Sequence, residues 1–122
     1  MTKRVLNRKS KLVAHAAAVE AQIAMTERDL MESLRSAARE CGWLVYHPFL
    51  SKWSEKGFPD LIMIRNGKGF AWELKSAKGK VTDAQQTWMD ALRGIPGVSA
   101  RVVYPDDLEK AYQALVTGEW KE

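Results

Sequence analysis

Several features that would point to particular classes of protein are scarce or missing in this sequence. It has a single cysteine, Cys41, which excludes an intrachain disulfide and a zinc site built from cysteines. No apolar run approaches the roughly 20 residues that a membrane-spanning helix needs. The basic N-terminus is not followed by an apolar segment with a small-residue cleavage site, so no signal peptide is expected. We therefore expect a cytoplasmic protein without a membrane partner.

Glycine-rich phosphate loops, histidine-rich sites and internal repeats are also missing, which disfavours a phosphohydrolase acting on small nucleotides. What is present is the composition of an ordinary globular domain. The 122 residues are 46% hydrophobic and 28% charged, enough for one compact domain with a core.

Acidic residues are absent from the first 12 positions, where the basic side chains give a charge of +5: Lys3, Arg4, Arg8, Lys9 and Lys11. The net charge of +4 leaves −1 for the other 110 residues, so the basic excess belongs to this end. Such a tail either contacts nucleic-acid phosphates or is a solubilising end, and charge alone does not decide between the two.

Apolar spacing and turn residues predict a mixed α/β sheet flanked by helices, in the order α-β-β-β-α-β-α. The helices are expected over 26–41, from Thr82 and from Pro105, and the strands over 43–49, 60–65, 70–76 and 98–104. Residues 1–25 are expected to form a separate basic tail with a possible amphipathic helix over 10–25. Residues 26–122 then form the main domain.

Helix starts and helix faces are the most local features of this prediction. Thr26 is expected to cap the first helix, and Thr82 with Gln85 forms a capping box for the second. The buried face expected for the second helix consists of Ala84, Trp88, Ala91, Leu92 and Ile95. The face expected for the last helix consists of Leu108, Ala111, Tyr112 and Leu115.

The segment GFPDLIMIRNGKGFAWELKS, residues 57–76, reads as a hairpin with charges inside its apolar arms. Its Asn-Gly dipeptide favours a two-residue type I′ turn. Counting back from that turn places Asp60 opposite Glu73, and alternation puts Lys75 on the same face.

Two adjacent carboxylates are costly to bury, and three arrangements would compensate. They can share a proton, pair with Lys75, or bind a divalent cation. Oxygen ligands with few protein contacts suit Mg²⁺ or Mn²⁺. The structural alternative is that Asp60 only caps the strand entry, while Glu73 and Lys75 lie on an exposed edge strand.

The motifs GFPDL and ELKSAKGKVTDAQQTW, followed by a strand and a Pro-Asp helix start, resemble the VRR-NUC family of the PD-(D/E)XK nuclease superfamily. The resemblance extends over about residues 26 to 116. It implies a restriction-endonuclease-like fold and a Mg²⁺- or Mn²⁺-dependent DNA endonuclease of a bacterial or phage-infected cell. Branched DNA, such as a Holliday junction or a flap, is the implied substrate, and a homodimer the implied assembly.

Residue by residue, the resemblance makes Asp60 and Glu73 metal ligands and Lys75 the catalytic lysine. The peptide carbonyl of Leu74 is implied as a further ligand. Glu27, on the first helix, matches an acid that completes the metal site in relatives. Its alternative role is a first-turn interaction with the helix dipole. Glu32, expected on the other face, is the reserve candidate.

Gln85 matches a glutamine that orients the lysine or a phosphate, and this role is compatible with capping. The resemblance also suggests residues that contact the DNA backbone: Ser54, Lys56, Lys78 and Lys80. His47 could line the cleft, and Trp53 or Phe58 could stack on an unpaired base. The alternative function is a non-catalytic nucleic-acid-binding module of a phage replication or packaging complex.

Overall fold

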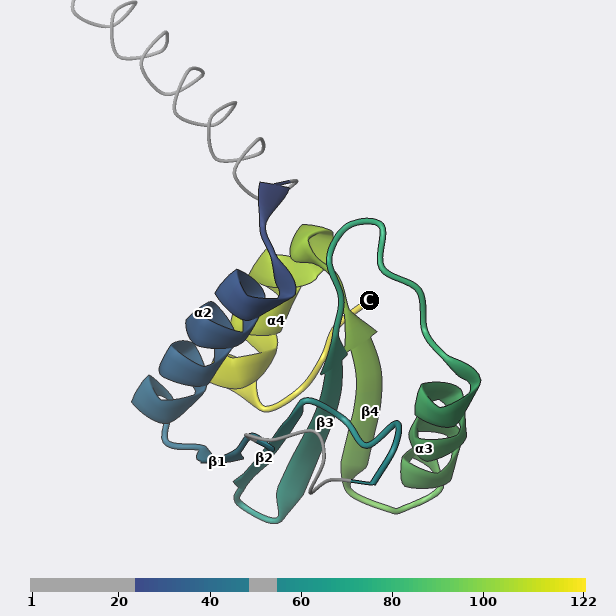
Figure 1. The fold of residues 1–122 in the computed structure, drawn as a ribbon. Coiled ribbons are helices and arrows are strands. Elements are labelled where there is room, and N and C mark those ends of the chain that lie inside the picture. Colours follow the sequence, from purple (N-terminus) through teal and green to yellow (C-terminus); the bar gives the residue numbers. More distant parts are fainter. Residues whose placement is uncertain (1–23, 49–54) are drawn as a thin grey trace, which may run out of the picture.

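Three helices and four strands make up the part of the chain that the computed structural model describes, residues 24–48 and 55–122 (Figure 1). In chain order they are α2 (Glu27–Glu40), β1 (Leu44–Tyr46), β2 (Leu61–Arg65), β3 (Lys68–Leu74), α3 (Asp83–Arg93), β4 (Val98–Val103), the 3-10 turn η2 (Pro105–Asp107) and α4 (Leu108–Thr117). The predicted order of elements is confirmed. The helix expected over 10–25 lies almost entirely outside the described residues. No described helix is long and apolar enough to cross a membrane.

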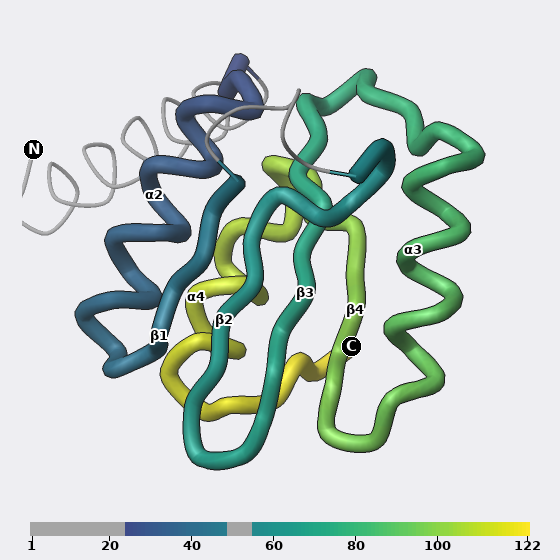
Figure 2. Tube along the Cα trace, turned by 60° about the horizontal axis from the view of Figure 1, so that its bottom comes forward, coloured from purple at the N-terminus to yellow at the C-terminus, as the bar shows by residue number. Residues whose placement is uncertain are grey.

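The sheet is mixed, with the strands in the order β1-β2-β3-β4 (Figure 2). The pairs β1–β2 and β2–β3 are antiparallel, and β4 is parallel to β3. A parallel pair needs a crossover, and α3 provides it. The mixed α/β class predicted from the sequence is therefore confirmed.

Helices cover the two faces of the sheet unequally. The main core lies between the sheet and the pair α2 and α4, and its fully buried members include Leu30, Leu34, Trp72 and Leu115. On the opposite face α3 packs mainly against β4 and β3 (Figure 1), over a smaller cluster that contains Met89. This arrangement leaves the α3 side of β1 and β2 largely uncovered.

The prediction of the buried face of α3 is partly wrong. Met89 is the fully buried residue of this helix, whereas Ala91 and Ile95 are exposed. Trp88 is used elsewhere, since its Nε1 donates to the carbonyl of Lys56 at 3.2 Å. A stripe of apolar residues in the sequence does not show that one of them, here Trp88, contacts a neighbouring loop and not the sheet.

The predicted face of α4 needs a smaller correction. Ala111 and Leu115 are buried as predicted, but Tyr112 is exposed and Ala114 takes its place in the core. A small side chain allows α4 to lie close to α2, with which it is in contact.

The β2–β3 hairpin has the turn and the register that the sequence predicts. Asn66 and Gly67 both have positive φ, 51° and 77°, as a type I′ turn requires. Pairing runs from Arg65 opposite Lys68 to Leu61 opposite Trp72. The strand bounds differ slightly, since β3 begins and ends two residues earlier than expected, and β1 is only three residues long.

Arg65 ties the hairpin to both helices of the main core. Its Nη1 donates to the carbonyls of Cys41 and Leu115, each at 2.9 Å, and its Nη2 donates to that of Val116 at 3.1 Å. The guanidinium also lies 4.5 Å from the ring centre of Trp43. The C-terminal ends of α2 and α4 are thereby joined to β2.

Candidate active site

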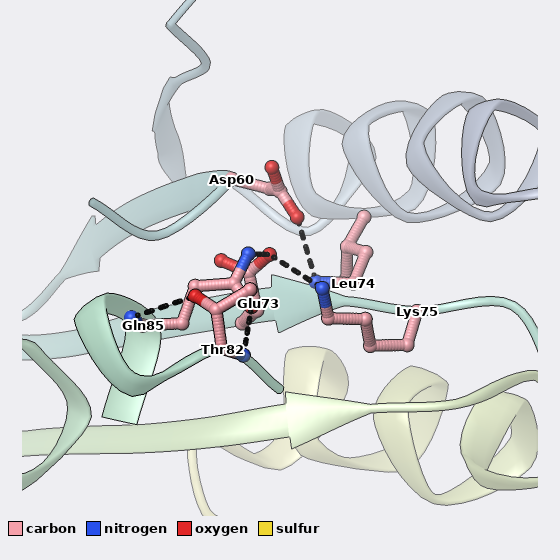
Figure 3. Close-up of polar contacts among 6 residues, drawn as sticks. All are labelled: Asp60, Glu73, Leu74, Lys75, Thr82 and Gln85. Carbon is pink, nitrogen blue, oxygen red and sulfur yellow. Dashed lines mark hydrogen bonds and ion pairs between the residues drawn. The ribbon is translucent and has the colours of Figure 1, made fainter. Parts of the chain in front are cut away.

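Asp60 lies one residue before β2, and Glu73 is the last residue but one of β3 (Figure 3). The hairpin register therefore brings the two carboxylates together on one face, as the sequence predicts. Asp60 Oδ2 accepts a hydrogen bond from the backbone N–H of Leu74 at 2.8 Å. His47 Nδ1 lies 3.1 Å from the carbonyl oxygen of Asp60 and bonds to it when this nitrogen is protonated. Asp60 is thus held through both its side chain and its backbone.

Glu73 is buried together with Lys75, and their exposed fractions are 2% and 8%. Glu73 Oε1 accepts a hydrogen bond from Gln85 Nε2 at 2.9 Å and lies 3.8 Å from the ammonium of Lys75. Its other oxygen, Oε2, is buried, and no hydrogen-bond donor of the described residues reaches it. This burial contradicts the alternative in which Glu73 and Lys75 lie on an exposed face.

The pKa of Glu73 is raised to about 8. Burial is the main cause, followed by the charge of Asp60 and a hydrogen bond with the Asp60 carboxyl; Lys75 opposes the shift, and Glu27 adds slightly to it. The ammonium of Lys75 therefore does not neutralise the acidic pair by itself. Burial and the neighbouring Asp60 therefore favour the protonated form of the Glu73 carboxyl.

Gln85 has two functions at the start of α3. Its side-chain oxygen accepts from the N–H of Thr82 at 2.9 Å, and the hydroxyl of Thr82 accepts from the N–H of Gln85 at 3.2 Å. The predicted capping box is thus confirmed. The side-chain nitrogen remains free to bond Glu73, so the helix terminus also orients this carboxylate.

The GFPD segment reaches the site by passing close to the start of α3. Gly57 has a φ of +87°, and an added Cβ would collide with the backbone of Ala84 and Gln85. Phe58 packs edge-on against Trp88 with ring centres 5.1 Å apart, which favours the packing role over base stacking. The glycine and the aromatic pair hold the loop so that Asp60 enters β2 beside Glu73.

Glu27 approaches the site from the other layer. It lies in the first turn of α2, whose start is fixed by a capping box between Thr26 and Asp29. Together with Asp60 and Leu74 it lines a cavity of about 410 Å³. Glu27 is exposed, so it lies at the rim of this cavity.

Glu32, which was expected to face away from the site, lines the same cavity. Its carboxylate lies 3.7 Å from the guanidinium of Arg35, one helical turn further on. The wall contributed by α2 is therefore wider than the apolar stripe of this helix suggests, since exposed residues of the helix also line the cavity.

The described residues contain no group of three or more His, Cys, Asp or Glu side chains close enough to hold a metal ion. The donors that are present still fit a hard cation with few protein ligands. Asp60 and Glu73 offer carboxylates, and Glu73 Oε2 is a buried oxygen without a donor. Glu27 lies across the cavity and could contribute from the rim.

The residues expected to contact DNA do not lie together at the cavity beside Asp60 in the described part of the chain. Ser54 and Trp53 lie outside the described residues. Lys56 is exposed in the loop before Gly57. Lys78 and Lys80 are exposed beside a separate hollow of about 490 Å³, which Asp106 and Asp107 also line. None of the lysines lines the cavity that contains Asp60.

Two arginines that line the cavity are not among the predicted site residues. Arg28 and Arg35 line it from α2, and His47 lines it from the end of β1 as expected. The two arginines are seven residues apart, about two turns of helix, so they lie on nearly the same face. The seven-residue spacing, which starts next to Glu27, could have predicted from the sequence that both arginines lie near the site.

Comparison with known families places this fold and site in a class. The family model of the VRR-NUC domain matches residues 6–107 of the chain. The protein therefore belongs to the VRR-NUC family, and its function is of the nuclease type. The match begins within the segment that the sequence analysis treated as a separate tail, and it ends before α4. No curated protein and no solved structure matches the chain.

Proposed function

We propose that this protein is a Mg²⁺- or Mn²⁺-dependent DNA endonuclease that hydrolyses phosphodiester bonds. The observation that carries the proposal is the buried pair Asp60 and Glu73, in which Glu73 Oε2 lacks a donor and the pKa of Glu73 is raised to about 8. Such a pair is stabilised by a divalent cation more effectively than by Lys75, which already lies 3.8 Å away.

Asp60, Glu73 and the carbonyl of Leu74 would hold the cation, with Glu27 completing its surroundings from the rim. When bound, the cation supplies polarisation of the phosphodiester and lowers the pKa of the attacking water. Lys75 stabilises the charge that develops on the phosphate, or positions the water, from a site largely closed to solvent. Gln85 bonds Oε1 of Glu73, which leaves Oε2 as the oxygen that would bind the cation.

The test is cleavage of duplex, nicked, flap and four-way DNA, with and without Mn²⁺. Glu73→Gln and Lys75→Met have nearly the same side-chain volumes as wild type and remove one charge each. We expect wild type to cut a branched substrate only with Mn²⁺, and each variant to lose at least about 100-fold in rate. If wild type cuts no DNA, the enzymatic proposal fails. If either variant cuts as fast as wild type, the site assignment fails.

A homodimer would suit a four-way junction, because both have two-fold symmetry. An exposed apolar strip on β1 and β2 supports it: Leu44, Tyr46 and Ile64 are 74%, 59% and 51% exposed, and Leu44 lies opposite Ile64. Sedimentation of the Leu44→Glu variant should show monomers where wild type shows dimers. Val116→Glu, at an exposed residue of α4, is the matched control and should leave the dimer intact.

A second candidate is a non-catalytic nucleic-acid-binding module of a phage replication or packaging complex. The observation in its favour is that no three metal-binding side chains are gathered together in the described part of the chain. Tight DNA binding without cleavage, and with no effect of Mn²⁺ on thermal stability, would identify this function instead.

A further inference from the structure

The cavity beside Asp60 has acidic and basic residues on the same wall. Glu27, Glu32 and Asp60 line it together with Arg28 and Arg35. A DNA strand that places a phosphate at Asp60 would lie next to this wall, because Asp60 and residues of α2 line the same cavity of about 410 Å³. The three carboxylates repel phosphates, so a strand needs cations here to be bound.

The two arginines are spaced to contact one strand. They are seven residues apart on α2, which corresponds to about 10 Å along the helix axis. Their directions differ by only about 20° around the helix, since seven residues are close to two full turns. Both guanidinium groups therefore project toward the same side.

Both arginines are available for a ligand. Within residues 24–48 and 55–122, the side chain of Arg28 has no hydrogen bond or ion pair, and it is exposed. Arg35 has one ion pair, to the exposed Glu32 at 3.7 Å, and such a surface pair contributes little free energy. A phosphate, which a guanidinium binds through two parallel hydrogen bonds, can replace it.

We propose that Arg28 and Arg35 bind the phosphates of the DNA strand that flank the scissile phosphate. They are positioning residues: they hold the strand along α2 and do not touch the reacting atoms. The inference rests on the proposed nuclease function, since it takes Asp60 to mark the reacting phosphate. The lysines expected to bind DNA, Lys78 and Lys80, lie at a different hollow and do not provide this contact.

The first experiment measures binding alone, by fluorescence anisotropy of labelled duplex and four-way DNA in EDTA over a range of salt concentrations. Wild type is compared with Arg28→Ala, Arg35→Ala and the double variant. The matched control is Arg39→Ala, an exposed arginine of the same helix outside the cavity. Each cavity variant should reduce the salt slope by about 0.9 and the affinity several-fold near 0.1 M salt, whereas Arg39→Ala should change neither.

The second experiment separates positioning from chemistry. With Mn²⁺, Arg28→Ala should raise KM about 5-fold or more and leave kcat within about 2-fold, because the lost contact is made equally in the ground state and the transition state. Arg28→Lys should restore the salt slope and only part of the affinity, because it keeps the charge but not the paired hydrogen bonds.

The inference fails if Arg28→Ala and Arg35→Ala bind DNA with the wild-type affinity and slope, or if Arg39→Ala weakens binding equally. Its failure is distinct from that of the proposed function. Wild type that cuts DNA while the arginine variants bind normally overturns only the inference. A wild-type protein that never cuts DNA, while each arginine variant loses affinity and salt slope, overturns the nuclease proposal and the position beside a scissile phosphate, and supports only the phosphate contacts of the two arginines.

Discussion

Gln85 donates a hydrogen bond from Nε2 to Oε1 of Glu73 at 2.9 Å, and its own Oε1 accepts from the N–H of Thr82 at 2.9 Å. One side chain thus caps α3 and orients a buried carboxylate of β3 (Figure 3). The amide of Gln85 can do both because it has an acceptor oxygen for the cap and a donor nitrogen for Glu73. The start of a helix and the candidate active site are therefore coupled through a single residue.

Substitution of Gln85 by Glu should separate these two roles. Glutamate keeps the acceptor that caps Thr82, so the cap should remain and thermal stability should fall only through the change beside Glu73. It loses the donor to Glu73 and adds a negative charge there, so Mn²⁺-dependent cleavage should fall at least about 10-fold. Melting curves and cleavage rates check the two outcomes.

Gln85→Ala removes both roles and should in addition lower the free energy of unfolding by about 1 kcal/mol, a usual value for a lost capping interaction. Gln86→Ala is the control, since the side chain of this exposed residue donates to Asp90 at 2.8 Å on the solvent side of α3. Full activity of Gln85→Glu would contradict the coupling.

The stability of the metal-free protein should depend on the protonation of Glu73. Burial, and then the charge and hydrogen bond of Asp60, raise the pKa of Glu73 from 4.5 to about 8, with Lys75 opposing. The unfolded chain loses this proton near pH 4.5, but the folded protein keeps it up to about pH 8. The contribution of Glu73 is therefore complete below the lower value and falls as the pH rises toward 8.

Urea unfolding in EDTA, with Glu73→Gln as reference, measures this contribution. The stability of wild type relative to the variant should fall with pH by up to about 1.4 kcal/mol per unit, and level off above about pH 8. A difference that is flat across this range would mean that the pKa of Glu73 is not raised.

Divalent cations should stabilise the folded protein through Asp60 and Glu73. Mn²⁺ should bind the folded state in preference to the unfolded state and so raise Tm, and more at pH 8 than at pH 6, since it competes with the proton of Glu73. Asp60→Asn and Glu73→Gln should lose most of this rise. Asp90→Asn, which changes an exposed acid of α3, should keep the rise in Tm. If Mn²⁺ raised the Tm of Glu73→Gln as much as that of wild type, the cation would bind elsewhere.

Glu27 and Glu32 line the same cavity but should differ in function. The charge of Glu27 acts on Glu73, whereas Glu32 pairs with Arg35 at 3.7 Å. Glu27→Gln should reduce Mn²⁺-dependent cleavage about 10- to 100-fold, as expected for a residue that supports a metal site, and Glu32→Gln only slightly. Cleavage titrated with Mn²⁺ measures both. If Glu32→Gln lost more cleavage activity than Glu27→Gln, Glu32 and not Glu27 would be the acid that supports the metal site with Asp60 and Glu73.

Arg65 should be important for stability and not for catalysis. Replacing it with Ala removes three hydrogen bonds that join β2 to the ends of α2 and α4, and should cost at least about 2 kcal/mol in the free energy of unfolding. Lys68→Ala, at the exposed partner across the turn, should change it by less than about 0.5 kcal/mol. Urea unfolding checks both. Cleavage below the melting transition should be unchanged.

The hairpin was predictable because its determinants are local. Asn66 and Gly67 fix the turn, and the turn fixes the register that brings Asp60 beside Glu73. The predicted N-cap at Thr26 and the capping box at Thr82 were equally local. The buried side of α3 was only partly predictable, because Trp88 serves the loop at Lys56 and not the sheet.

The sequence by itself determined the order of elements, the pairing of the two carboxylates and the position of Lys75, since short-range turn and strand geometry decides all three. Only the tertiary structure decided that α2 brings Glu27, Arg28 and Arg35 to one cavity with Asp60. Apolar periodicity shows which side of a helix is buried, but not which strand end that helix will reach. The raised pKa of Glu73 is also decided by the tertiary structure, because its main cause is burial, which depends on the packing of the whole domain.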